Sequence, residues 1–304
     1  MTNPTVCIVG TGTMGLGWAV SFCRAGWDVR LFDIDVERAQ TAAQTCLAIC
    51  DSLRVSARER GAAEGSQPID KAVSGARLVI EAVPEQLSLK QSVLNDIEQV
   101  FDPQGLVLSS TSAIPATHLA SAMTNPSRFL VAHPFNPSYL LPLVELVPGE
   151  KTSEYALDTA AALLESIGQQ VVKLRREIEG FVANRLQAAV VNEAVNLVAE
   201  GVASPADVDK CLKDCLGLRW AFFGPFETMD LNAPNGFEEY AQKFGDSYVE
   251  LGKKLLVANP WQPKALQEIA NYLAERDEDF ETKRQRRDTL VTQLLNLKQQ
   301  HRIG

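Results

Sequence analysis

The chain has 304 residues, which is long enough for two domains with separate hydrophobic cores. Its 46% hydrophobic and 22% charged residues are ordinary for a globular protein, and its formal charge of −9 argues against nucleic acid or an anionic membrane as a main partner. No apolar run approaches the roughly 18 residues that a membrane-spanning helix needs, and an expected strand begins within five residues of the N-terminus. We therefore expect a cytoplasmic protein without a signal peptide.

The first residues follow the pattern of a dinucleotide-binding unit. Residues 6–9 form a short apolar run that predicts a strand. The sequence G-x-G-x-x-G follows at residues 10–15, a helical segment then ends at Gly26, and a second strand, residues 29–32, ends at Asp33. In this pattern one glycine permits the tight turn, the next lets the backbone approach a pyrophosphate, and the third allows helix and strand to pack closely. The helix N-terminus then faces the phosphate charge.

These features together predict an NAD site. Asp33 lies where a carboxylate can accept hydrogen bonds from both ribose hydroxyls, and it would repel the 2′-phosphate of NADP. The alternative is a glycine-rich turn without a ligand, but strand, helix, strand and acid occur in the order that cofactor binding needs. The cofactor contacts expected from this unit are Gly10, Gly12, Thr13, Met14, Gly15 and Asp33.

Strands and helices alternate along the chain up to about residue 175. We expect helices over residues 35–62, 89–100 and 153–166. Further strands are expected over residues 78–83, 106–109, 129–132, 143–147 and 170–174. This alternation predicts an N-terminal, Rossmann-type, doubly wound and mostly parallel sheet.

After this region the sequence shows only helical patterns and turns. A long helix is expected over residues 180–200, and it is too apolar to face solvent on all sides. The sequence therefore predicts an α/β protein with an NAD-binding domain over residues 1–177 and an all-α domain over residues 178–304.

The six cysteines are expected to be ordinary buried thiols. They are Cys7, Cys23, Cys46, Cys50, Cys211 and Cys215. Two pairs are spaced four residues apart on expected helices, and none forms a C-x-x-C motif. We expect no metal site and no disulfide, but small side chains in a reducing compartment.

His133 is the candidate catalytic base. It directly follows an expected strand, and ligands of open α/β sheets bind at the carboxyl ends of strands. An imidazole can remove the proton of a substrate hydroxyl, and a carboxylate on its other ring nitrogen can fix the tautomer. Glu145, twelve residues later, is the candidate carboxylate. The alternatives are a histidine that caps a turn and a solvated strand glutamate, while His118 and His301 have the pattern of surface residues.

Several motifs in this chain resemble those of the 3-hydroxyacyl-CoA dehydrogenase family. The motifs occupy residues 109–112, 133–137, 143–145 and 180–185, within a match from about residue 5 to 245. The resemblance implies that His133 is the base and Glu145 its partner, and that Ser112 and Asn184 hold the reacting oxygen. A hydroxyl and an amide can both donate to a developing oxyanion, although local turn or helix hydrogen bonds are the alternative.

The same resemblance assigns further residues to the cofactor and the substrate. It implies cofactor contacts for Glu85, Lys90 and Ser110, and a substrate contact for Asn136. Members of the family form dimers through apolar helices such as the one expected over residues 180–200, so a homodimer through the C-terminal domain is expected.

Departures from the CoA pattern bear on the substrate. That pattern has asparagine where this chain has Ser110, and it has a longer, lysine-rich segment where residues 37–67 hold no lysine. Residues 217–229 resemble more closely the branch of the family that contains L-gulonate 3-dehydrogenase, also known as lambda-crystallin, and carnitine dehydrogenases are similar too. Arg219, in an apolar and glycine-rich turn, would then bind the carboxylate of a small free acid, or pair with a structural carboxylate.

Four functions therefore remain open. We expect an NAD-dependent dehydrogenase that oxidises the 3-hydroxyl group of a small free hydroxy acid of the L-gulonate type. The alternatives are a 3-hydroxyacyl-CoA dehydrogenase of the 3-hydroxybutyryl-CoA type and a carnitine 3-dehydrogenase. The non-enzyme alternative is a crystallin-like structural protein that retains a nucleotide site.

Overall fold

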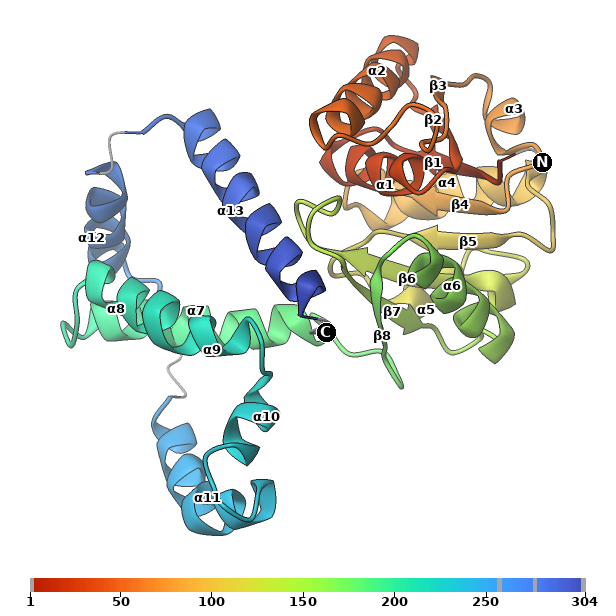
Figure 1. The fold of residues 1–304 in the computed structure, drawn as a ribbon. Coiled ribbons are helices and arrows are strands. Elements are labelled where there is room, and N and C mark those ends of the chain that lie inside the picture. The colour runs from red at the N-terminus through yellow and green to blue at the C-terminus, as the bar shows by residue number, and fades with distance from the viewer. Residues whose placement is uncertain (1–2, 256–258, 276–277, 302–304) are drawn as a thin grey trace. The chain divides into compact units, whose positions relative to one another are not determined.

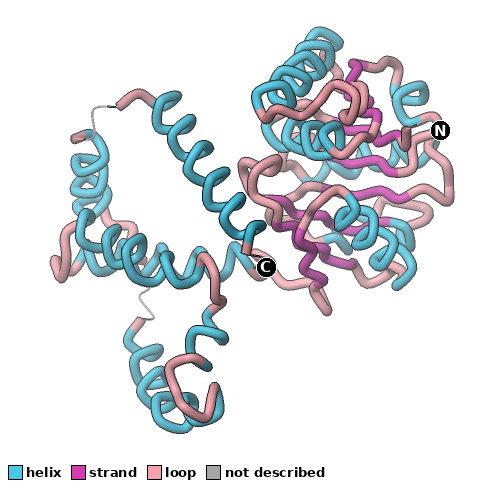
Figure 2. Tube along the Cα trace, in the orientation of Figure 1, coloured by secondary structure: helices cyan, strands magenta, loops and turns pink. Residues whose placement is uncertain are grey.

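The computed structural model describes residues 3–255, 259–275 and 278–301. These residues form two compact units that divide between Asn184 and Arg185. The first unit is built on one sheet with helices on both faces (Figures 1 and 2), and the second is helical. The predicted fold class is therefore confirmed: a doubly wound, mostly parallel sheet is followed by an all-α region.

The sheet has eight strands, and its order places the first strand near the middle. The strands are β1 (Thr5–Val9), β2 (Asp28–Phe32), β3 (Ala63–Gly65), β4 (Leu78–Glu81), β5 (Leu106–Ser109), β6 (Phe129–Pro134), β7 (Leu143–Pro148) and β8 (Gln170–Lys173). The order across the sheet is β3-β2-β1-β4-β5-β6-β7-β8. All neighbours are parallel except β6 and β7, which are antiparallel and place His133 directly opposite Glu145.

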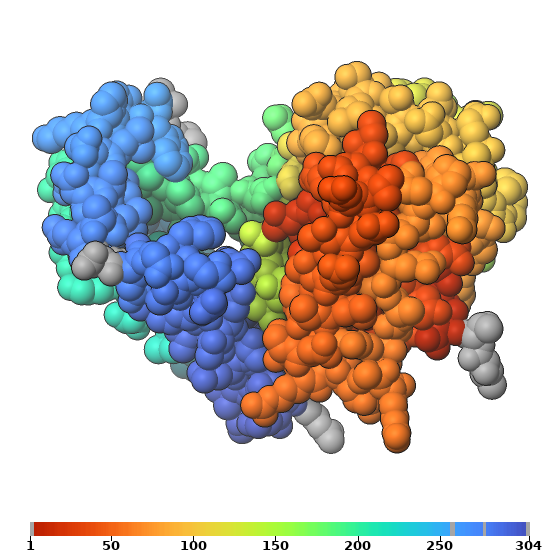
Figure 3. Space-filling view, turned by 90° about the horizontal axis from the view of Figure 1, so that it is seen from above, coloured from red at the N-terminus to blue at the C-terminus, as the bar shows by residue number. Residues whose placement is uncertain are grey.

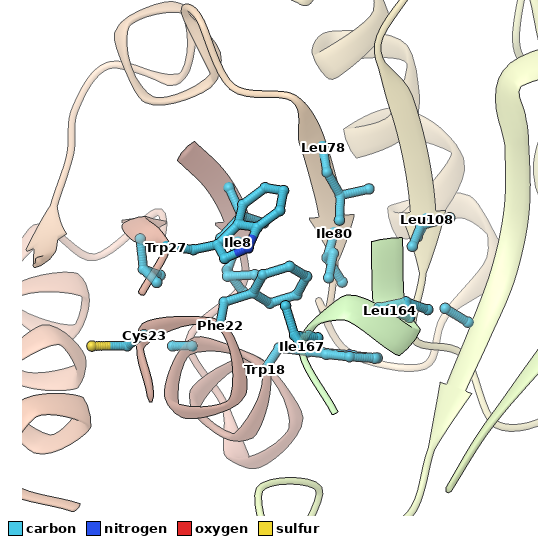
Figure 4. Close-up of a cluster of buried hydrophobic side chains, with 14 of the residues drawn as sticks. Ile8, Trp18, Phe22, Cys23, Trp27, Leu78, Ile80, Leu108, Leu164 and Ile167 are labelled. Carbon is cyan, nitrogen blue, oxygen red and sulfur yellow. The ribbon is translucent and has the colours of Figure 1, made fainter. Parts of the chain in front are cut away.

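Helices cover both faces of this sheet because its central strands are apolar on both sides. The helices of the first unit are α1 (Thr13–Arg24), α2 (Val36–Ser52), α3 (Ile69–Val73), α4 (Leu87–Val100), α5 (Ala116–Ala120), the short helix η1 (Pro126–Arg128) and α6 (Glu154–Ser166). One buried cluster joins α1, α2 and α6 to the sheet, and includes Trp18, Phe22 and Leu164 (Figure 4). The other joins α3, α4 and α5, and includes Leu94 and Leu119.

The second unit contains helices that bury little of their own surface. Its helices are the greater part of α7 (Ala183–Ala199), then α8 (Pro205–Cys211), η2 (Leu212–Leu216), α9 (Gly217–Trp220), α10 (Pro225–Asp230), α11 (Phe237–Lys254), α12 (Pro263–Ala274) and α13 (Phe280–Gln300). Neither α11 nor α13 buries any side chain that the structure describes. Side chains of α13 form part of the molecular surface in the space-filling view (Figure 3). No described helix is long and apolar enough to cross a membrane.

The helix predicted over residues 35–62 is shorter than expected and ends at Ser52. The helix stops because Arg54 adopts a left-handed conformation with φ of 59°. The Arg54 N–H donates to the Asp51 carbonyl (2.9 Å), and the Val55 N–H donates to the Cys50 carbonyl (3.0 Å). These two hydrogen bonds form a Schellman motif, in which the residue with the left-handed conformation is usually glycine. An arginine at that position gave no signal in the sequence.

Two other expectations about local structure were wrong or incomplete. Arg219 lies in a helix, not in a glycine-rich turn, because Gly217 has an ordinary helical φ of −62° and does not end the helix. Strand β3 and helix α3 were not predicted, since three and five residues are too short to show a period.

Candidate active site

The glycine loop between β1 and α1 is shaped by close contacts on one side and open space on the other. Gly10 has φ of +99°, and a Cβ there would lie 2.7 Å from the Ala82 backbone. A Cβ on Gly15 would lie 1.9 Å from the Gly10 carbonyl oxygen, so the helix can approach the loop only without a side chain. A Cβ on Gly12 would meet no described atom within 4 Å. The loop therefore has the turn, the close packing and the open backbone surface that a pyrophosphate needs.

The open side of this loop faces a cavity of about 860 Å³. Five of the predicted cofactor residues line it: Gly10, Gly12, Thr13, Met14 and Asp33. Gly12 also precedes the first turn of α1, a twelve-residue helix, whose unpaired N–H groups and positive dipole end favour an anion. The size, the backbone donors and the acid fit NAD.

Asp33 is held by the same loop. Its Oδ2 accepts hydrogen bonds from the Thr11 N–H (3.0 Å) and the Thr11 hydroxyl (2.7 Å), and its Oδ1 accepts from the Asp35 N–H (3.2 Å). Burial raises the pKa of the Asp33 carboxyl, but these bonds outweigh burial and leave that pKa below its usual value. The carboxylate therefore stays ionised next to the cavity, as recognition of ribose hydroxyls requires.

A buried ion pair joins α4 to the end of β4. The Lys90 Nζ lies 2.8 Å from Glu81 Oε1 and 3.3 Å from Glu85 Oε2, and it donates to the Val83 carbonyl (3.0 Å). Lys90 and Glu81 are 1% and 0% exposed. Lys90 was predicted as a cofactor contact, but here its ammonium holds protein groups and does not line the cavity.

Glu85 connects this ion pair to the loop that carries Ser112. Its Oε1 accepts hydrogen bonds from the Thr111 hydroxyl, the Ser112 N–H (3.0 Å) and the Ala113 N–H (3.1 Å). The Asn184 side-chain amide donates to the Ser112 carbonyl (3.2 Å), so the structure brings these two predicted site residues together. Ser112 itself is exposed, which leaves its hydroxyl accessible.

His133 and Glu145 form a buried pair across β6 and β7. His133 Nδ1 lies 2.9 Å from Glu145 Oε2, and the residues are 3% and 1% exposed. The imidazole packs against the rings of Phe135 and Phe181, with centroids 4.6 and 5.3 Å away. An ionised carboxylate can only accept, so this contact favours the tautomer with its proton on Nδ1 and an unprotonated Nε2.

The other oxygen of Glu145 holds the start of α7. Glu145 Oε1 accepts hydrogen bonds from the Val182 N–H (2.8 Å) and the Ala183 N–H (2.9 Å). Burial raises the pKa of the Glu145 carboxyl, but the hydrogen bonds from His133, Ala183 and Val182 outweigh burial and keep that pKa below its usual value. Glu145 therefore remains a carboxylate, and it lies at the N-terminal end of α7, where the helix dipole favours negative charge.

The remaining predicted site residues, Ser110, Asn136 and Arg219, do not line the cavity. Ser110 accepts a hydrogen bond from the indole Nε1 of buried Trp18 (2.7 Å). Asn136 is exposed. Arg219 belongs to the second unit, where its exposed guanidinium donates to Cys215 Sγ (3.8 Å).

Glu81, Thr111 and Arg38 were not among the predicted site residues. Arg38 lines the cavity, and Glu81 and Thr111 belong to the network that holds Ser112. Glu81 did leave a signal, because it is an acid inside the apolar run 78–83, where burial demands a partner.

Most of the chain matches two family models. Residues 5–178 match the NAD binding domain of 3-hydroxyacyl-CoA dehydrogenase, and residues 180–272 match the C-terminal domain of that enzyme. The chain is 34% identical over 308 residues to a lambda-crystallin homolog of Rattus norvegicus, covering 97% of this chain and 96% of the relative. It is also 34% identical over 307 residues to an L-carnitine dehydrogenase of Oceanobacillus iheyensis, covering 96% of this chain and 97% of the relative.

Solved structures of dehydrogenases share the fold. One is an NAD+ dependent dismutase, 5-formyl-3-hydroxy-2-methylpyridine 4-carboxylic acid 5-dehydrogenase, with a TM-score of 0.72 and 29% identity over 90% of this chain and 95% of that chain. Another is an (S)-3-hydroxybutyryl-CoA dehydrogenase from Ralstonia eutropha, with a TM-score of 0.65 and 28% identity over 83% of this chain and 89% of that chain.

The glycine loop gives a matched pair of substitutions. Gly12→Ala should change the free energy of unfolding by less than about 1 kcal/mol, because its φ of −68° suits alanine and the added methyl meets open space. It should weaken NAD binding about 5- to 150-fold, since that methyl overpacks the cofactor by about 1–3 kcal/mol. Gly15→Ala should instead destabilise the fold by about 3 kcal/mol or more. Calorimetric NAD titration and urea unfolding would check both, and equal effects of the two substitutions would contradict this assignment.

Proposed function

Because the chain belongs to the 3-hydroxyacyl-CoA dehydrogenase family, we propose that it oxidises the 3-hydroxyl group of a small free hydroxy acid of the L-gulonate type. NAD is the cofactor, and when bound it supplies the acceptor for the hydride that leaves the substrate carbon. The observation that carries the proposal is the buried 2.9 Å contact between His133 Nδ1 and Glu145 Oε2.

His133 acts as the general base in this proposal. With its Nδ1–H bound to Glu145, the ring presents an unprotonated Nε2 to the substrate hydroxyl. As the proton arrives, the ring becomes a cation, and the Glu145 carboxylate stabilises that charge at short range. The hydrogen bonds from Val182 and Ala183 keep the carboxylate from turning away, so the imidazole keeps one orientation.

Ser112 and Asn184 hold the reacting oxygen. The Ser112 hydroxyl and the Asn184 amide can each donate to an oxygen that gains negative charge. The structure supports this role by joining the two residues through the 3.2 Å hydrogen bond from Asn184 Nδ2 to the Ser112 carbonyl. The Asn184 amide has a second N–H for the substrate. Cofactor contacts by Glu85, Lys90 and Ser110, and a substrate contact by Asn136, remain predictions.

Sequence similarity supports a free acid as substrate more than a CoA thioester. The relatives named lambda-crystallin homolog and L-carnitine dehydrogenase match over 96% or more of this chain. The (S)-3-hydroxybutyryl-CoA dehydrogenase is 28% identical, below the 34% of these two relatives. Carnitine, also a 3-hydroxy acid, is the second candidate substrate, because the L-carnitine dehydrogenase of Oceanobacillus iheyensis matches 96% of this chain.

The choice of substrate can be tested with a panel of L-gulonate, L-carnitine, 3-hydroxybutyrate and 3-hydroxybutyryl-CoA. Production of NADH should be fastest with L-gulonate, judged by kcat/KM. Turnover of the thioester alone would reject the free-acid proposal. Turnover of none of the four would favour a structural protein that only binds the nucleotide.

Replacing the base should separate catalysis from cofactor binding. His133→Asn should lower kcat about 10²- to 10⁴-fold, the usual contribution of a general base, and leave NADH affinity unchanged. His118→Asn is the matched control, because His118 is exposed and should not affect turnover. Full activity of His133→Asn in stopped-flow and steady-state assays would remove His133 as the base.

Arg219 is proposed to bind the substrate carboxylate. Its guanidinium is exposed within the second unit and offers a bidentate fork for a carboxylate. Arg219→Met should raise KM for the acid about tenfold or more, because a charged hydrogen bond contributes about 1.5–3 kcal/mol, and NAD affinity should not change. Lys213→Met, which removes an exposed cation from the same helical segment, should have little effect. Unchanged KM and kcat in Arg219→Met would refute the assignment.

The C-terminal domain, residues 178–304, is proposed to form a homodimer. Of the described side chains of α7, only Val195, Asn196 and Val198 are buried, and on α11 the large side chains of Phe244 and Val249 are 44% and 58% exposed. Exposed apolar side chains of this size favour burial against a partner surface. In the family, such helices form the dimer contact. Sedimentation at micromolar concentration should show a dimer, and Phe244→Asp should shift it toward monomer. A wild-type monomer would contradict the proposal.

A further inference from the structure

Three cysteines that lie far apart in sequence converge in the core of the first unit. Cys23 is on α1, and Cys46 and Cys50 are one turn apart on α2. Their sulfur atoms all lie within 4.8 Å of one another, and all three residues are 0% exposed. In Figure 4 the Cys23 sulfur points away from the side chains of Ile80 and Leu108 on the sheet. It is the only group of its kind among the described residues.

The spacing of the sulfurs suits one metal ion. Metal–thiolate bonds of about 2.3 Å place the three sulfurs of a trigonal site about 4 Å apart. The observed spacing, with every pair within 4.8 Å, therefore needs only small side-chain rotations to reach that geometry. Thiolates are soft ligands and select soft ions.

We propose that Cys23, Cys46 and Cys50 form a binding site for one copper(I) ion. Structural zinc takes four ligands in a tetrahedron, whereas these residues offer three sulfurs. The Gly61 carbonyl oxygen contacts the cluster, but it already accepts a hydrogen bond from the Cys23 thiol (3.2 Å). Full burial leaves the site without solvent access for a water ligand, so the cluster favours the ion that accepts three soft ligands.

The three cysteines come from two helices that pack against one another in the core of the first unit. The bound ion would join α1, the helix that begins at the cofactor loop, to α2.

The experiment should start from the Cys211→Ala, Cys215→Ala protein. Both of these residues are exposed and lie one helical turn apart, so they could bind copper(I) independently. The full-length reduced protein is titrated anaerobically with copper(I) against a competing chelator, and stoichiometry is read by native mass spectrometry. We expect one ion per chain, with three sulfur ligands by X-ray absorption.

Substitutions within the cluster supply the decisive comparison. Cys46→Ser should weaken copper(I) affinity about tenfold or more, since losing a ligand costs at least as much as losing one of its supporting groups. Cys50→Ser should do the same if Cys46→Ser fails to fold. Cys7→Ser is the control, because Cys7 is equally buried but lies outside the cluster. Absence of binding, or unchanged affinity in the folded Cys46→Ser and Cys50→Ser proteins, would overturn the proposal.

Discussion

Glu145 connects three parts of the first unit through its two carboxylate oxygens. One oxygen accepts from His133 on the antiparallel neighbour strand, and the other accepts from the backbone at the start of α7. A buried carboxylate must satisfy all of its hydrogen bonds or lose its charge, so none of these contacts is independent of the others. The orientation of the imidazole, the ionisation of the acid and the place where α7 begins therefore follow from one residue.

A second buried charge network lies at the ends of β4 and β5, and like Glu145 it holds separate segments in place. Glu81 and Lys90 are fully buried, and Lys90 reaches Glu85, which holds the Ser112 loop. A buried ion pair adds little net stability over an apolar pair of similar size, but removing one partner costs about 3–5 kcal/mol. Such a pair fixes geometry more than it adds stability. Here it fixes the loop that brings Ser112 to Asn184.

Periodic and positional signals in the sequence predicted the fold and the His133–Glu145 pair, because apolar runs, glycines and a histidine at a strand end are local features. What could not be predicted depends on contacts between distant residues. Arg54 closes α2 in a position where glycine is usual, and the Lys90 ammonium lies 2.8 Å from Glu81, a contact that no local pattern indicates. The thiol cluster needs Cys23 from another helix, which no spacing rule within α2 could reveal.

Glu145 sets the tautomer of His133 by accepting the hydrogen bond of its Nδ1–H. NMR of the protein labelled with ¹⁵N in histidine measures this directly, because protonated and unprotonated ring nitrogens have distinct shifts. His133 of the NAD-bound protein should carry its proton on Nδ1, with an unprotonated Nε2, and Glu145→Gln should lose this preference. A proton on Nε2 of neutral His133 in the unmodified protein would show that Glu145 does not set the tautomer.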